Sequence, residues 1–161
     1  MTMRMLSRRA VLLCALSVAA AWPARGQAAR LQSFEKESLS IRTRTGTHRF
    51  TVEIARRPPQ HAQGLMFRRH LAADAGMLFL YGGARRASMW MKNTYIPLDM
   101  VYIDATGRVV GFFERAVPGS LEVITSEKPV TAVLELNAGT VSRLAIAVGD
   151  RVLHPAFQPG G

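Results

Sequence analysis

The chain has 161 residues, of which 48% are hydrophobic, and a formal net charge of +10. This length is enough for one domain with its own hydrophobic core. Cys14 is the only cysteine, which excludes an intrachain disulfide and any site built from several thiolates. The excess of arginine is typical of solvated loop charge, and the alternative is attraction to anionic envelope surfaces. Nucleic acid is not expected, because aromatic residues do not alternate with the arginine pairs.

The first 26 residues have the pattern of an export signal. Arginines precede the apolar run Ala10–Ala21, and Ala24-Arg25-Gly26 offers small residues at a cleavage site before Gln27. The run is too short to span a bilayer, which needs about 20 residues. No later stretch is long and apolar enough either, so no transmembrane helix is expected after cleavage. Arg8-Arg9 also fits a twin-arginine signal, and both export routes stay open. We therefore expect an exported protein of the periplasm or cell envelope.

The chain after the signal is expected to begin its fold with a β-hairpin. Apolar residues alternate with polar ones on both sides of Thr45-Gly46, which predicts two strands with one buried face. Pro58-Pro59 then ends the second strand and begins a short helix. The continuous apolar run Gly76–Tyr81 predicts a fully buried strand, and Gly82-Gly83 is expected to turn the chain.

Strand patterns continue through the second half of the chain. They cover Ala87–Met91, Leu98–Ile103, Arg108–Glu114, Val130–Leu136 and Arg151–Leu153. Thr140 can cap a short helix over Val141–Ile146. We therefore expect a single, mainly β domain over residues 38–154, barrel-like or sandwich-like, with one or two short helices. Residues 27–37 are expected to form a loose leader and residues 155–161 a flexible tail.

The stretch Ser88–Met100 concentrates residue types that are uncommon in a purely packed strand. Trp90 offers a flat wall, while Lys92, Asn93 and Asp99 offer polar groups, a combination typical of pockets for sugars or small acids. In this interpretation Lys92 meets an anionic group of the ligand, and Asp99 orients Lys92 by pairing with it. The alternative is structural: Asn93 bonds its own backbone in a turn, and Asp99 anchors Lys92.

Glu135 provides a second candidate carboxyl group. It lies between Leu134 and Leu136, so it faces the other side of its strand if the leucines face the core. One interpretation is an exposed or salt-bridged strand glutamate. The other pairs Glu135 with Asp99 for acid–base chemistry. The second interpretation predicts a hydrolase or transferase that acts on envelope glycans.

The methionines suggest a third hypothesis. Met89 and Met91 are two residues apart and would share one face of a strand, with Trp90 on the other. Thioethers suit Cu(I), which predicts a periplasmic Cu(I)-binding module, although methionines also fill irregular cores. The four histidines show no metal-ligand spacing, and no nucleotide-binding or hydrolase motif is present. No cofactor is predicted.

Several blocks of the sequence resemble one family of exported prokaryotic proteins. They are Gln63–Arg68, Gly76–Phe79, Trp90–Thr94, Ile96–Asp99, Leu134–Leu136, Ala138-Gly139 and Gly149-Asp150. The chain is similar to Domain of Unknown Function 192 from about Leu39 to Val152. The resemblance implies a small β-rich domain and no catalytic residue, since the family's activity is unassigned. The favoured prediction is an exported soluble domain that binds a small ligand or an envelope component. The enzyme and Cu(I) hypotheses stay open, as does the oligomeric state.

Overall fold

The computed structural model describes residues 31–157 of the chain. The expected signal peptide, the start of the leader and residues 158–161 of the tail lie outside the described residues. The elements follow one another as β1 (Glu35–Thr43), β2 (Gly46–Ala55), α1 (Pro58–Gln63), β3 (Ala75–Arg85), β4 (Ser88–Met89), β5 (Leu98–Ile103), β6 (Val109–Ala116), β7 (Ile124–Thr125), β8 (Val130–Asn137), α2 (Thr140–Leu144), β9 (Arg151–Leu153) and the 3-10 helix η1 (Pro155–Phe157). The expected mainly β fold with two short helices is confirmed.

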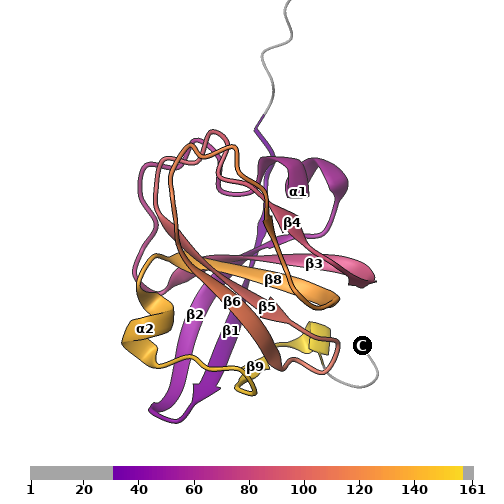
Figure 1. The fold of residues 1–161 in the computed structure, drawn as a ribbon, viewed down its shortest axis with the longest axis vertical. Coiled ribbons are helices and arrows are strands. Elements are labelled where there is room, and N and C mark those ends of the chain that lie inside the picture. Colours follow the sequence, from indigo (N-terminus) through magenta and orange to yellow (C-terminus); the bar gives the residue numbers. More distant parts are fainter. Residues whose placement is uncertain (1–30, 158–161) are drawn as a thin grey trace, which may run out of the picture. The chain divides into compact units, whose positions relative to one another are not determined.

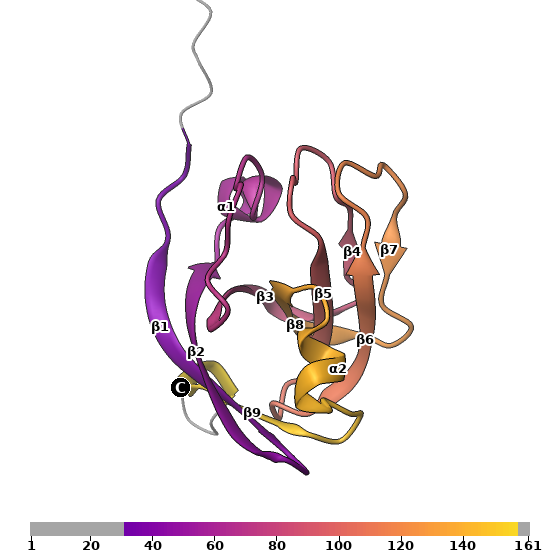
Figure 2. The same ribbon diagram turned by 90° about the vertical axis from the view of Figure 1, so that its left-hand side faces the viewer.

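Seven of these strands form one curled sheet in the order β6-β5-β8-β3-β2-β1-β9. All neighbours are antiparallel except β2 and β3, which run parallel. The connection between β2 and β3 must cross over, because parallel neighbours cannot be joined by a tight turn, and α1 lies in that crossover. Figure 2 shows β1 and β2 on one side of the domain and β5 and β6 on the other, with β3 and β8 between them.

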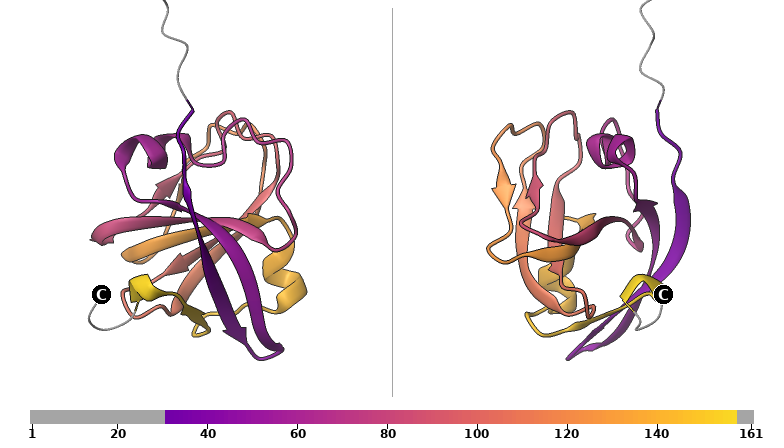
Figure 3. Two further views of the ribbon diagram at one scale, coloured as in Figure 1. Left: turned by 180° about the vertical axis from the view of Figure 1, so that it is seen from behind. Right: turned by 90° about the vertical axis from the view of Figure 1, so that its right-hand side faces the viewer.

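The two edges of the curled sheet come together. Arg108, just before β6, forms an isolated antiparallel bridge with Arg151 at the start of β9. The backbone N–H of Val152 donates to the carbonyl of Gly107 at 2.8 Å, and the N–H of Val109 donates to the carbonyl of Asp150 at 2.9 Å. These bonds satisfy edge groups that would otherwise be open to another strand. The result is the barrel-like curl visible in Figures 1 and 3.

The sheet is buried on both faces at β3, β5 and β8. The first core cluster draws residues from strands all around the sheet, together with residues of α2 and η1, so it fills the concave side. The second cluster covers the other face of β3, β5 and β8 with residues from the segments after α1 and around β4, including Leu65, Met91 and Ile96. Successive residues of a strand point to opposite faces. Leu134 and Leu136 therefore belong to the first cluster while Val133 belongs to the second.

Several boundaries differ from the sequence-based expectations. The β1 strand already begins within the expected leader, because Glu35 pairs with Ile54. Gly82-Gly83 does not turn the chain but lies within β3. The expected strand over Ala87–Met91 is reduced to Ser88–Met89, which pairs with the unexpected short strand β7. Part of the expected tail is ordered, since Phe157 packs in the first core cluster.

No helix within residues 31–157 is long and apolar enough to cross a membrane.

Candidate functional site

A small cavity of about 70 Å³ lies beside α1, β3, β4 and β8, on the side of the second core cluster. It is lined by His61, Ala62, Gln63, Gly64, Met66, Phe79, Ser88, Met89, Trp90, Thr94 and Glu135. Liquid water occupies about 30 Å³ per molecule, so the cavity holds about two waters or the end group of a larger molecule. We call it the Trp90 cavity.

Glu135 is the chemically unusual member of the Trp90 cavity. It lies in the middle of β8, in register with Met77 on one side and Met100 on the other, and it is 4% exposed. Burial raises the pKa of its carboxyl group to about 8, because desolvation disfavours the charged form. At neutral pH the group is therefore mainly a neutral acid, which can donate a hydrogen bond as well as accept one.

Two tyrosines interact electrostatically with this acid and carry hydroxyl groups. The hydroxyl of Tyr81 donates to Sδ of Met89 at 3.5 Å, while the hydroxyl of Tyr102 is buried without a hydrogen-bond partner. Burial is the largest cause that raises both tyrosine pKa values to about 12, and the charge of Glu135 adds to it. Near neutral pH all three groups are therefore predominantly protonated.

His61 and Met66 add a ring nitrogen and a thioether sulfur to the cavity wall. Neither residue was among the predicted site residues. Nε2 of His61 lies 2.9 Å from the carbonyl oxygen of Ala55. A carbonyl only accepts, so Nε2 carries the hydrogen and a neutral His61 keeps a free lone pair on Nδ1. Met66 receives a weak hydrogen bond at its Sδ from Nδ2 of Asn93, at 3.9 Å. In the sequence Met66 is one of several methionines and lies in the Gln63–Arg68 block, but only Met89 and Met91 were paired as ligands, and His61 shows no ligand spacing.

The four residues predicted to bind ligand do not form one pocket. Trp90 lines the Trp90 cavity, whereas Lys92 and Asn93 line a separate shallow groove of about 480 Å³ with Tyr95 and Leu121. The ammonium of Lys92 lies 5.0 Å from the centre of the Trp90 ring, so these two side chains are neighbours. Asn93 adopts a positive φ of 55°, a left-handed turn conformation that asparagine tolerates.

Asp99 belongs to neither pocket. Its side chain is fully buried, with Oδ1 accepting the backbone N–H of Arg115 and Oδ2 accepting the N–H of Val141, both at 2.9 Å. The first bond ties β5 to the irregular end of β6, and the second satisfies an N–H in the first turn of α2. No ion pair joins Asp99 to Lys92 in the described part of the chain; the carboxylate oxygens of Asp99 accept backbone N–H groups instead. The side chain of Asp99 links β5, β6 and α2 rather than orienting Lys92.

The register also separates the two carboxyl groups proposed for acid–base chemistry. Met100 of β5 pairs with Glu135 of β8, and Asp99 pairs with Leu136. Met100 lies in the second core cluster and Leu136 in the first. Asp99 and Glu135 thus face opposite sides of the sheet. This arrangement does not support a joint acid–base role.

The proposed methionine pair is divided between the core and the cavity. Met91 is fully buried in the second core cluster, while Met89 is partly exposed and lines the Trp90 cavity. A soft metal ion in this cavity would meet Met66, Met89 and His61 rather than Met91. Within the described part of the chain, no group of three or more His, Cys, Asp or Glu side chains is placed to hold a metal.

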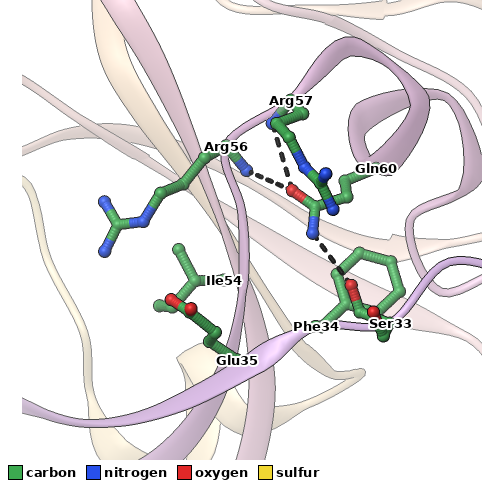
Figure 4. Close-up of a pocket in the computed structure, with 7 residues that line it drawn as sticks. All are labelled: Ser33, Phe34, Glu35, Ile54, Arg56, Arg57 and Gln60. Atoms are coloured by element: carbon green, nitrogen blue, oxygen red, sulfur yellow. Dashed lines mark hydrogen bonds between the residues drawn. The ribbon is translucent and has the colours of Figure 1, made fainter.

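A second cavity, of about 450 Å³, lies where α1 begins (Figure 4). The side chain of Gln60 bonds to three backbone groups of the lining residues. Oε1 of Gln60 accepts the N–H groups of Arg56 and Arg57 at 3.1 Å, and its Nε2 donates to the carbonyl of Ser33 at 2.9 Å. Arg56 is also paired with Glu37 at 2.7 Å. These contacts fasten the start of the described chain to α1, a structural task.

Comparison with known proteins places the chain in a family. Residues 40–154 match DUF192, described as "Uncharacterized ACR". The chain belongs to DUF192. A structure of a Sinorhizobium meliloti 1021 protein, provisionally named a transcription regulator, is 49% identical, covers 79% of this chain and 99% of its own, and has a TM-score of 0.76. A structure of a protein of unknown function from Novosphingobium aromaticivorans DSM 12444 is 37% identical, covers 84% of this chain and 94% of its own, and has a TM-score of 0.72. No curated protein matches the chain.

Proposed function

We propose that this DUF192 protein is exported to the periplasm or cell envelope and binds a small organic ligand there. The ligand's carboxylate or hydroxyl end group enters the Trp90 cavity and accepts a hydrogen bond from Glu135. The observation that supports this proposal is the position of Glu135, a buried acid in a cavity wall.

The energetics of Glu135 favour a binding role over a packing role. A buried polar group without a strong partner costs about 1–3 kcal/mol, and burial is the one cause of the raised pKa of Glu135. A leucine or methionine at this position would avoid that cost, as the register neighbours Met77 and Met100 do. Strongly shifted pKa values of this kind concentrate at functional sites. A ligand that accepts the proton of Glu135 in a hydrogen bond would offset the cost.

The remaining cavity wall suits the same ligand class. Trp90 supplies an aromatic face, and the cavity is also lined by the hydroxyl-bearing residues Ser88 and Thr94, a mixture typical of small-molecule sites. Lys92, beside Trp90 and outside the cavity, would favour an anionic ligand. Binding is preferred to the envelope-glycan hydrolase or transferase hypothesis, because that hypothesis needs Asp99 and Glu135 in one site.

Cu(I) is a second candidate ligand, supported by a different observation. The thioethers of Met66 and Met89 and the imidazole of His61 line one cavity together with Trp90. Thioether and imidazole groups are ligands that Cu(I) accepts, and a tryptophan ring can stabilise a nearby cation. This set replaces the Met89–Met91 pair of the sequence hypothesis.

A fluorescence and thermal-shift experiment tests both candidates. Trp22→Phe in the full chain leaves Trp90 as the sole tryptophan, so its emission reports on the cavity. The chain would be titrated with small carboxylic acids, with monosaccharides, and with Cu(I) kept reduced by ascorbate. A ligand that binds only the folded state raises the melting temperature with concentration. Glu135→Gln tests the cavity, and Glu122→Gln, at an exposed position, is the matched control.

The outcomes separate the candidates. An acid or sugar that shifts both signals, weakly with Glu135→Gln and fully with Glu122→Gln, supports the organic ligand. Its affinity should fall above about pH 8 as Glu135 ionises. A Cu(I) response that is lost with Met66→Leu and Met89→Leu, but kept with Glu135→Gln, supports the metal instead. A response that is insensitive to all three variants would refute a site in the Trp90 cavity.

A further inference from the structure

Large apolar side chains gather on the surface next to the Trp90 cavity. Phe67, Trp90, Tyr95 and Leu121 are 46%, 45%, 51% and 68% exposed. Phe67 and Tyr95 are in edge contact, with ring centres 6.3 Å apart, and Tyr95 and Leu121 line the same groove. Large apolar side chains exposed close to one another often mark an interaction surface. We call these four residues the aromatic patch.

Two cations lie directly on the rings of the aromatic patch. The guanidinium of Arg69 is 5.4 Å from the centre of the Tyr95 ring, and the ammonium of Lys92 is 5.0 Å from the centre of the Trp90 ring. The neighbouring Arg68 is neutralised by a bidentate pair with Glu53, at 3.0 and 2.6 Å. The patch thus joins exposed rings to two cations that have no carboxylate partner within salt-bridge distance in the described part of the chain.

The aromatic patch lies at the end of the domain where the described chain begins. The N–H of Gln32 donates to Oε1 of Gln63 at 2.7 Å, four residues before Phe67. The N–H of Phe67 in turn donates to the carbonyl of Asn93 at 2.8 Å. Figures 1 and 2 show α1 and the loops that follow β4 and β6 at this one end. Thirty residues precede Leu31, and they include the arginine-flanked apolar run Ala10–Ala21.

We propose that the aromatic patch docks on the surface of an anionic lipid bilayer. Tryptophan and tyrosine prefer the headgroup region because their rings are apolar with a polar edge. Lysine and arginine beside them attract anionic lipids. The apolar segment expected to enter the membrane during export precedes Leu31 in the chain, so it would tether the domain to the bilayer while the two remain connected. The negative charge of Glu122, next to Leu121 in the sequence, offsets part of the positive charge of Arg69 and Lys92.

Quenching of Trp90 by brominated lipids measures this docking directly. The full chain carrying Trp22→Phe would be mixed with vesicles of phosphatidylcholine and phosphatidylglycerol, with or without bromine on the acyl chains. Docking predicts that Trp90 emission shifts to shorter wavelength and that brominated lipid lowers its intensity by roughly half. The effect should weaken several-fold in pure phosphatidylcholine or at high ionic strength, because the cations are exposed. Binding through residues 1–30 alone would leave Trp90 unquenched.

Variants of the patch make the test specific. Tyr95→Ser with Leu121→Ser should abolish the quenching, and Arg69→Glu should reduce it together with its salt dependence. Phe113→Ser, at a ring that is 42% exposed on β6, is the matched control and should change nothing. Circular dichroism of each variant confirms that it is folded. Vesicle binding without quenching of Trp90, or quenching that survives the double variant, would overturn the proposal. A patch that instead self-associates, seen as a dimer in ultracentrifugation without vesicle binding, would also overturn it.

Discussion

Asp99 and Glu135 lie on neighbouring strands of one sheet, yet their carboxyl groups face opposite sides of it. Asp99 points to the side of α2 and is engaged by two backbone N–H groups, while Glu135 points to the Trp90 cavity with a raised pKa. The two carboxyl groups therefore have different surroundings in one fold. Asp99 holds elements together, and Glu135 borders the Trp90 cavity.

The first prediction concerns Asp99. Asp99→Ala removes both bonds at 2.9 Å and leaves the N–H groups of Arg115 and Val141 without acceptors. We expect the free energy of unfolding to fall by about 3 kcal/mol, since hydrogen bonds to charged groups contribute about 1.5–3 kcal/mol each. Asp99→Asn keeps one acceptor and should lose about half as much. Urea unfolding measures both, with Asp74→Ala at an exposed position as control. An unchanged midpoint for Asp99→Ala would contradict the anchoring role.

The second prediction concerns the pH dependence of stability. The carboxyl pKa of Glu135 is raised from 4.5 to about 8 on folding. The folded state therefore holds a proton that the unfolded state has lost between these two pH values, and stability falls as pH rises through this window. The slope is about 1.4 kcal/mol per pH unit from this group. Glu135→Gln should flatten the dependence of stability on pH. The stability of the variant relative to the native chain should therefore rise from pH 5 to pH 8.

Thermal melts across pH 4–9 of the native chain, Glu135→Gln and Glu122→Gln test this prediction. The exposed control Glu122→Gln should follow the native profile. Parallel profiles for all three proteins would mean that Glu135 ionises at an ordinary pKa. They would contradict the prediction that Glu135 is a neutral acid in the Trp90 cavity.

The third prediction separates the two methionines around Trp90. Met91 is fully buried and Met89 is partly exposed beside the cavity. Met91→Ala should cost about 2–5 kcal/mol of stability, because it removes a packed side chain and leaves a void. Met89→Ala should cost only about 1 kcal/mol but should weaken Cu(I) binding if that ion is the ligand. Guanidinium unfolding compares the two. Equal costs would show that Met89 is as much a core residue as Met91.

The fourth prediction concerns Gly76, where β3 approaches β8. A Cβ atom there would lie 2.6 Å from the backbone oxygen of Glu135 and 2.8 Å from Cδ2 of Leu136. Gly76→Ala should therefore cost about 1–3 kcal/mol through overpacking and should displace the strand that carries Glu135. Gly82→Ala in the same strand, with open space around the new methyl group, is the matched control. Both are compared by thermal melts. Equal melting temperatures for the two variants would contradict the close approach.

The sequence alone determined those elements whose signals lie within a few residues. Strand β5 runs from Leu98 to Ile103, and β9 from Arg151 to Leu153, as predicted. The hairpin of β1 and β2 and the helix that begins at Pro58 were also predicted. Alternation of side chains further predicted that Glu135 faces away from Leu134 and Leu136. All of these follow from local periodicity and turn chemistry, which the chain carries along its length.

Only the tertiary structure decided what each side chain meets. Lys92 lies seven positions from Asp99 in sequence, but the carboxylate of Asp99 bonds to the N–H groups of Arg115 and Val141, 16 and 42 positions away. The second face of β8 is buried because segments after α1 and around β4 cover it, and this burial turns Glu135 from a surface charge into a neutral acid. Partners and burial depend on contacts between distant segments, and hydrogen-bond geometry and desolvation arise only when those segments pack together.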